Sequence, residues 1–127
     1  MLKKFFTHDL YIKVSKNKFE AKNLSMNGKW ESNYPNSPFT TNRLLVGTFS
    51  AAEPALTQLV KRILPSGLFA KRPQMVIHPT DMVEGGLSEV EERIFKELGL
   101  GSGAFKVVIH IGAELSDEQA IKLLGEV

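Results

Sequence analysis

The chain contains no cysteine in its 127 residues, which excludes disulfide bonds, zinc–thiolate sites and thiol catalysis. It also lacks any apolar run near the roughly 20 residues that span a bilayer. Charge of one sign is not in large excess either, because the net charge is only +2. This net charge is well below the strongly positive charge that is typical of a dedicated nucleic-acid-binding protein. A content of 43% hydrophobic and 24% charged residues is typical of a globular protein. We therefore expect one domain over residues 1–127.

The first third of the chain predicts a β-hairpin followed by a long polar loop. Leu10–Val14 and Phe19–Leu24 are rich in good strand formers and read as two strands. Between them, Lys16 and Asn17 predict a two-residue turn, in which Asn17 tolerates the left-handed backbone. Residues 25–42 are rich in Asn, Ser, Thr, Gly and Pro, which is typical of a loop.

The remaining two thirds predict alternating strands and helices. Three Ser–x–x–Glu/Gln pairs have the spacing of a capping box at a helix start: Ser50 with Glu53, Ser88 with Glu91, and Ser116 with Gln119. Pro65 and Gly67 end the first helix, Ala51–Leu64, whose apolar stripe includes Leu56, Leu59, Val60 and Ile63. The second helix has the stripe Val90, Ile94 and Leu98 with Gly99 as its stop, and the third has Ala120, Ile121 and Leu124. Further strands are expected at Leu44–Phe49, Met75–Ile77 and Lys106–Ala113.

The predicted element order is βββαβαβα. Three consecutive strands form an antiparallel meander, and two crossover helices then add parallel strands. We therefore predict an α/β fold of the ribonuclease-H-like type, with a mixed five-stranded sheet and helices packed on it. This is the unit from which actin-like proteins are assembled.

Several stretches resemble the bacterial actin homologue MreB. "MLKKFFTHDLYIKV" is similar to its opening, and "GTFSAAEPALTQLVKRI" and "RPQMVIHPTDMVEGGLSEVEERIF" are similar to later strand–helix segments. The likeness spans nearly all of this chain. In MreB it covers only about the first third, which is one actin subdomain. It implies a role in cell shape. It also implies weak peripheral membrane contact by the N-terminal tail, residues 1–8, through Leu2, Lys3, Lys4, Phe5 and Phe6.

A second resemblance rests on "NRLLVGTFSAAE" and "EGGLSEVEERI". These stretches are similar to a small YjaA-like family of bacterial stress-induced proteins, which matches this chain in length. That family implies stress physiology and no established biochemical activity.

The first hairpin departs from the nucleotide-binding pattern of MreB. Lys13 stands where MreB has the acid that organises Mg²⁺, and Val14 stands for the glycine that lets the backbone approach phosphate. Glu114 lies near the position of the catalytic glutamate without a clean match. Because of these departures from the MreB pattern, we expect no catalytic residue and no cofactor. Lys13, Lys16 and Asn17 remain a weaker alternative as a phosphate, nucleotide or nucleic-acid site.

Two histidines are expected on neighbouring strands. His78 and His110 are predicted to approach each other, either as a buried, hydrogen-bonded pair or, as the weaker alternative, as a metal pair without a third ligand. Asp81 follows a strand but reads as a turn or cap residue. Basic pairs at Lys61-Arg62 and Lys71-Arg72 read as solvated surface charge, so no nucleic-acid partner is expected.

The sequence as a whole predicts a domain without enzymatic activity. We expect an MreB-like protein that contacts a protein partner in cell-shape or stress physiology. "MLKKFF" lacks the apolar stretch of a signal peptide, so the expected location is the cytoplasm, including the inner face of the membrane.

Overall fold

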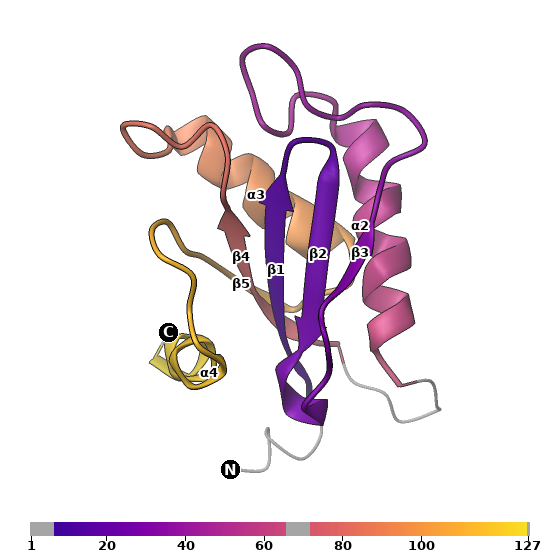
Figure 1. The fold of residues 1–127 in the computed structure, drawn as a ribbon, viewed down its shortest axis with the longest axis vertical. Coiled ribbons are helices and arrows are strands. Elements are labelled where there is room, and N and C mark those ends of the chain that lie inside the picture. Colours follow the sequence, from indigo (N-terminus) through magenta and orange to yellow (C-terminus); the bar gives the residue numbers. More distant parts are fainter. Residues whose placement is uncertain (1–6, 66–71, 127) are drawn as a thin grey trace.

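A computed structural model describes residues 7–65 and 72–126 of the chain. Within these ranges, five strands form one sheet in the order β3-β2-β1-β4-β5 (Figure 1). β1 is antiparallel to β2 and parallel to β4, β2 is antiparallel to β3, and β4 is parallel to β5. The prediction of a mixed five-stranded sheet with the order βββαβαβα is confirmed. The strands are β1 Asp9–Ser15, β2 Lys18–Asn23, β3 Glu31–Asn33, β4 Gln74–Pro79 and β5 Lys106–Ile109.

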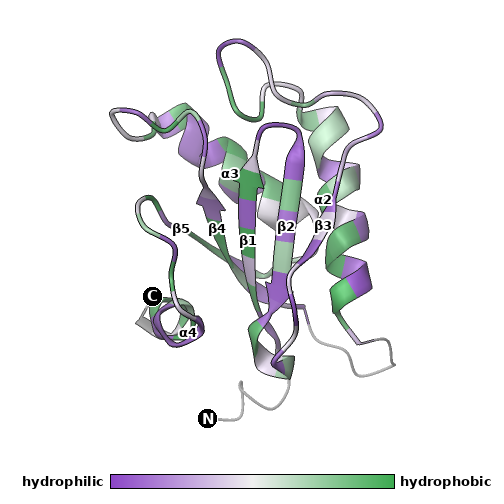
Figure 2. Cartoon of the chain, in the orientation of Figure 1, coloured by the Kyte–Doolittle hydropathy of each residue, from purple (hydrophilic) through white to green (hydrophobic). Residues whose placement is uncertain are grey.

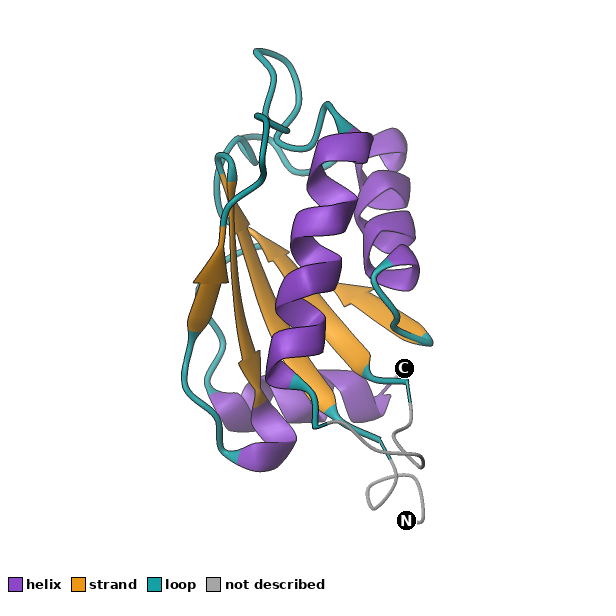
Figure 3. Ribbon diagram, turned by 90° about the vertical axis from the view of Figure 1, so that its right-hand side faces the viewer, coloured by secondary structure: helices purple, strands orange, loops and turns teal. Residues whose placement is uncertain are grey.

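Helices cover both faces of the sheet. The helical elements are the 3-10 turn η1 Leu24–Met26 and the helices α2 Phe49–Ile63, α3 Glu89–Gly101 and α4 Asp117–Glu126. α2 and α3 pack on one face and α4 on the other (Figure 3). The larger core lies between the sheet and α2 with α3, and the smaller one places Ala120 and Leu124 of α4 against Tyr11 and Val76.

The helix α2 buries the face that the sequence predicted. Leu56, Leu59, Val60 and Ile63 are all buried against the sheet. The predicted capping box of Ser50 with Glu53 is wrong, because the helix begins at Phe49 with Thr48 as its N-cap. Only the carbonyl of Thr48, and not its side chain, accepts bonds from the first-turn amides.

The predicted third strand at Leu44–Phe49 is wrong. Leu45 and Val46 are buried, but they belong to a turn in which the amides of Gly47 and Thr48 donate to the carbonyl of Phe39. These apolar residues close one end of the larger core and do not pair in the sheet.

Part of the predicted loop 25–42 supplies the third strand instead. Glu31–Asn33 pairs with β2, and the side-chain amide of Asn33 donates to the carbonyl of Ala55 in α2 at 2.9 Å. The polar composition of Glu31–Asn33 is typical of a loop, although these residues form a strand at the edge of the sheet.

The helix α3 begins as predicted and ends later. The capping box of Ser88 with Glu91 is confirmed by both of its hydrogen bonds. Gly99 is not the predicted stop, because α3 continues to Gly101 and Gly99 is buried inside it. A Cβ at Gly99 would lie 2.6 Å from Val107 Cγ2, so glycine permits close packing of α3 on β5. In the predicted stripe, Val90 is 65% exposed, and Phe95 takes its place in the core.

The last strand is shorter than predicted. β5 ends at Ile109 rather than Ala113, because the chain turns and His110 Nε2 bonds the carbonyl of Ala113 at 2.8 Å. The capping box of Ser116 with Gln119 is confirmed, with Gln119 N donating to Ser116 Oγ at 3.1 Å and Ser116 N donating to Gln119 Oε1 at 2.8 Å.

The N-terminal membrane prediction falls on residues that the structure does not describe. Residues 2–6 and Gly67 lie outside the described residues. Of the helices in the described ranges, none combines the length and the apolar character needed to cross a membrane.

Candidate functional site on the α4 face of the sheet

A polar cluster joins the strands to the loop that precedes α4. Figure 1 shows α4 beside one end of the sheet, where its residues Ala120 and Leu124 pack on Tyr11 of β1 and Val76 of β4. The α4-side polar cluster consists of Tyr11, Lys13, Trp30, His78, His110 and Glu114. Period-two alternation along β1 places Tyr11 and Lys13 on this face, while Leu10 and Ile12 belong to the larger core on the other.

The hydrogen bonds of Tyr11 and His78 indicate which tautomer the neutral imidazole adopts. The backbone N–H of Leu115 donates to Tyr11 Oη at 3.0 Å, which leaves the hydroxyl proton for His78 Nδ1 at 2.8 Å. The Gly112 carbonyl can only accept, so at 2.8 Å it takes the proton on His78 Nε2. In its neutral form, His78 is therefore protonated on Nε2.

Burial stabilises the neutral forms of both groups. It lowers the pKa of His78 below the ordinary 6.5, partly offset by the Gly112 carbonyl, and the charges of His110 and Lys13 lower it further. Burial also raises the pKa of Tyr11 above 10.0. Because His78 is only 2% exposed, the pair acts as a link between β1, β4 and the loop that follows β5.

The two histidines lie close together, as the sequence predicted. The ring centroids of His78 and His110 are 4.7 Å apart, with the rings nearly perpendicular. His78 uses both ring nitrogens in hydrogen bonds, and His110 uses Nε2. Metal ligation by His78 would require it to lose one of these bonds. In the ranges 7–65 and 72–126, no three His, Asp or Glu residues are grouped so that they could hold a metal ion.

Lys13 pairs with an acid and packs over an aromatic ring. Its Nζ lies 2.7 Å from Glu114 Oε1 and 4.3 Å from the centroid of the Trp30 ring. The hydrogen bond from Lys13 lowers the pKa of the Glu114 carboxyl. Trp30 also packs edge-on against Tyr11, with the ring centroids 5.1 Å apart. Lys13 therefore connects β1 to the loop before α4.

Two other lysines of this sheet face are paired with acids as well. Lys22 Nζ lies 2.8 Å from Asp117 Oδ1, and Lys18 Nζ lies 3.9 Å from Glu20 Oε2. These pairs neutralise much of the positive charge that a polyanion would need for attraction. The sheet face of β1 and β2 is thus mixed in charge.

The turn residues of the first hairpin form hydrogen bonds with neighbouring loops. Asn17 has φ 53°, which confirms the predicted left-handed conformation. Its Oδ1 accepts from Phe39 N at 2.8 Å and from Thr40 N at 2.9 Å, so the turn anchors the loop that follows β3. The Lys16 backbone N–H donates to Asp81 Oδ2 at 2.9 Å.

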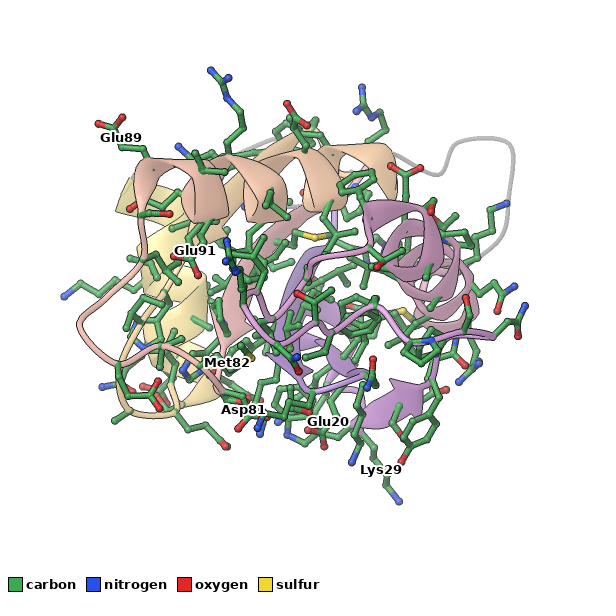
Figure 4. The ribbon with its side chains drawn as sticks, turned by 90° about the horizontal axis from the view of Figure 1, so that it is seen from above. Glu20, Lys29, Asp81, Met82, Glu89 and Glu91 are labelled. Carbon is green, nitrogen blue, oxygen red and sulfur yellow. The ribbon has the colours of Figure 1, made fainter. Side chains whose placement is uncertain are left out.

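These bonds occupy donors that a bound phosphate would need. Asp81 places its carboxylate at the turn, on the loop that Figure 4 labels with Asp81 and Met82. The Asn17 backbone N–H is likewise taken, by Thr40 Oγ1 at 3.0 Å. Of the three residues in the phosphate alternative, Lys13 lies within β1 with its Nζ paired to Glu114, and Lys16 and Asn17 lie in the turn with their backbone N–H groups bonded to Asp81 and Thr40.

Tyr11, Trp30 and Glu114 complete a cluster that the sequence only partly indicated. The alternation of β1 puts Tyr11 beside Lys13, which was a usable signal. Trp30 and Glu114 arrive from a loop and from the segment after β5, and nothing in their local sequence indicates that they meet Lys13.

Comparison with known proteins gives one informative result. No protein-family model matches the chain. The chain is 35% identical over 126 residues to the uncharacterized protein YjaA of Escherichia coli (strain K12), and the match covers 92% of this chain and 97% of YjaA. The identity thus extends over nearly the whole of both chains. This chain belongs to the YjaA family.

Proposed function

We propose that this protein is a non-catalytic domain that acts through protein contacts in stress or cell-shape physiology. The observation that carries the proposal is the internal use of the reactive groups on the α4 face. His78, Tyr11 and Lys13 each bond other parts of the same chain, and His78 is shielded from solvent. In the described residues, no buried side-chain polar atom lacks a hydrogen-bond partner. Buried groups whose hydrogen bonds are satisfied within the chain are those expected to stabilise a domain.

We further propose that the fold is of the ribonuclease-H-like, actin-subdomain type. The strand order β3-β2-β1-β4-β5, with β2 the antiparallel member among strands that otherwise share one direction, supports this assignment. The MreB resemblance rests on the quoted sequence stretches alone, and it is the source of the cell-shape part of the proposal.

The part of the α4-side face over β2 and β3, around the exposed Tyr34, is our proposed contact surface for a protein partner. Tyr34 is 62% exposed, with Lys18 Nζ 5.9 Å from its ring centroid, and Trp30 is half-buried nearby on the α4 face. Tyr and Trp are enriched among the residues that dominate protein interfaces. The lysines of this face are paired with acids, which favours a protein surface of mixed charge over a nucleic acid.

A ligand titration tests the non-catalytic part. Trp30 is the single tryptophan of the chain, so its fluorescence reports on the α4 face. We expect neither heat nor a change in Trp30 emission when ATP with Mg²⁺, or a short RNA, is added to the protein. Saturable heat with either ligand, or hydrolysis of ATP above a buffer blank, would overturn the proposal.

A matched pair of variants tests the contact surface. Proteins cross-linked to the wild type in bacterial lysate should be lost with Tyr34→Ala and retained with Val90→Ala. Val90 is 65% exposed on α3, which packs on the opposite face of the sheet, so it offers a control of similar exposure. Equal retention by both variants would rule out this face.

Weak peripheral membrane contact by residues 2–6 is proposed from the MreB resemblance, together with a location in the cytoplasm or at the inner face of the membrane. Sedimentation with anionic liposomes should show weak binding that disappears when the first six residues are removed. Binding that survives the truncation would show that the anchor lies elsewhere.

A further inference from the structure

Among the residues that the structure describes, the strand β5 forms an open edge of the sheet. It pairs with β4 on one side and ends the strand order. Sheet edges are commonly protected by an outward lysine or a proline. Here Lys106 Nζ instead donates to the carbonyl of Leu124 in α4 at 2.6 Å, and the remaining residues of β5, Val107–Ile109, are apolar and half-exposed. The opposite edge, β3, consists of the polar residues Glu31–Asn33.

Apolar surface surrounds this open edge. Phe105 and Ile111, just before and after β5, are 40% and 38% exposed. A groove of about 260 Å³ lies between β5 and α3, and Val107, Ile109 and Ile111 contribute its apolar lining. Figure 2 shows β5 as a hydrophobic ribbon at this end of the sheet. Exposed apolar surface beside unpaired strand backbone favours addition of another strand.

We propose that the occupant of this edge is a second copy of the chain, paired antiparallel through β5 about a two-fold axis at Val108. Within the paired strands, this axis sets Val107 of each copy opposite Ile109 of the other, as apolar cross-strand partners. The exposed Phe105 and Ile111, which flank β5, then lie at the two ends of the same apolar seam. The two sheets join into one continuous sheet with an isologous interface.

The charges beside the groove favour a second copy over an unrelated peptide. Glu92 and Lys96 lie on the groove side of α3, one helical turn apart, and neither forms an ion pair with another residue of the ranges 7–65 and 72–126. The two-fold axis places two antiparallel α3 helices on the same face of the joined sheet. Glu92 of one copy then faces Lys96 of the other, and the same contact repeats across the axis. A rim with one acid and one base is therefore complementary to itself.

This self-association goes beyond the proposed function, because it uses the β5 edge and not the surface of β2 and β3 around Tyr34. Either proposal can fail while the other stands.

Charge reversal tests the arrangement directly. In sedimentation equilibrium, the wild type should reach twice the 14.1 kDa mass of the chain. Either E92K or K96E alone should weaken the dimer by about tenfold or more, since like charges then meet at two places. An equal mixture of the two variants should recover the dimer, because each supplies the charge that the other lacks. The control E97K makes the same charge change at an exposed α3 residue that does not line the groove, and it should dimerise like the wild type.

The absence of cysteine permits a second, independent test. At the two-fold axis the residues of a cross-strand pair lie about 4.5–5.5 Å apart between Cα atoms, which is within reach of a disulfide. Val108→Cys should therefore form a disulfide-linked dimer under mild oxidation far faster than Ser32→Cys on the opposite edge strand β3. A monomeric wild type, equal effects of E92K and E97K, or equal cross-linking of the two cysteine variants would each overturn the proposal.

Discussion

Removal of one oxygen atom from Tyr11 tests the polar cluster most directly. The hydroxyl accepts from Leu115 N and donates to His78 Nδ1, so Tyr11→Phe leaves two polar groups without their partner while the ring stays in place. A buried polar group without a hydrogen bond costs about 1–3 kcal/mol. Two groups lose their partner here, but Leu115 is only half-buried and its N–H costs less. We therefore expect a total loss of about 2–4 kcal/mol in the free energy of unfolding.

Urea denaturation at neutral pH measures this loss, and the chain provides a matched control. Tyr34 is the other of its two tyrosines and is 62% exposed. The same deletion, Tyr34→Phe, should change the free energy of unfolding by less than about 0.5 kcal/mol. If the two variants were equally stable, the hydrogen bonds of Tyr11 would not hold the loop before α4, and the assignment of His78 as a structural group would be refuted.

Other parts of the fold give further expectations. Because burial keeps the pKa of folded His78 below 6.5, the unfolded chain takes up its proton first. Stability should thus be full above about pH 6.5 and fall as the pH decreases toward the folded pKa, with a slope in urea denaturation that His78→Gln flattens. A steeper slope in that variant would contradict this. Gly99→Ala should cost about 1–3 kcal/mol in the same assay, because the new methyl group meets Val107, and an unchanged midpoint would be inconsistent with close packing there. Leu59→Ala should cost about 2–5 kcal/mol, and a loss below about 0.5 kcal/mol would argue against burial of this α2 face. Asn17→Ala should lower the thermal midpoint, since it removes two hydrogen bonds and strains the turn, and an unchanged midpoint would count against an anchoring role.

Local pattern predicted those elements whose stability is itself local. The first hairpin follows from strand formers on either side of a turn that suits Asn17, and α2 follows from its apolar stripe. The predicted strand at Leu44–Phe49 was wrong because a short apolar run fits a buried turn as well as a strand. Conversely, Glu31–Asn33 lies at an edge where polar residues are tolerated, so its composition indicated a loop.

The candidate site depended on contacts that local pattern does not encode. The proximity of His78 and His110 followed from strand order, and the structure places them together. By contrast, the partners of Lys13 come from distant segments, namely Trp30 and Glu114. Gly99 was misread for a related reason, because a glycine that ends a helix and one that admits a neighbouring strand look alike in sequence.

The loop after β5 connects the polar cluster to the proposed dimer edge. Gly112 and Leu115 are held by His78 and Tyr11, which draws the chain away from the line of β5 directly after His110. Ile111 lies between the end of the strand and the first of these anchors, and this position leaves it 38% exposed beside the groove. The hydrogen bonds of His78 and Tyr11 therefore also fix the place of an apolar side chain beside β5. The polar cluster on the α4 face is thus linked to the proposed dimer edge through the loop that follows β5.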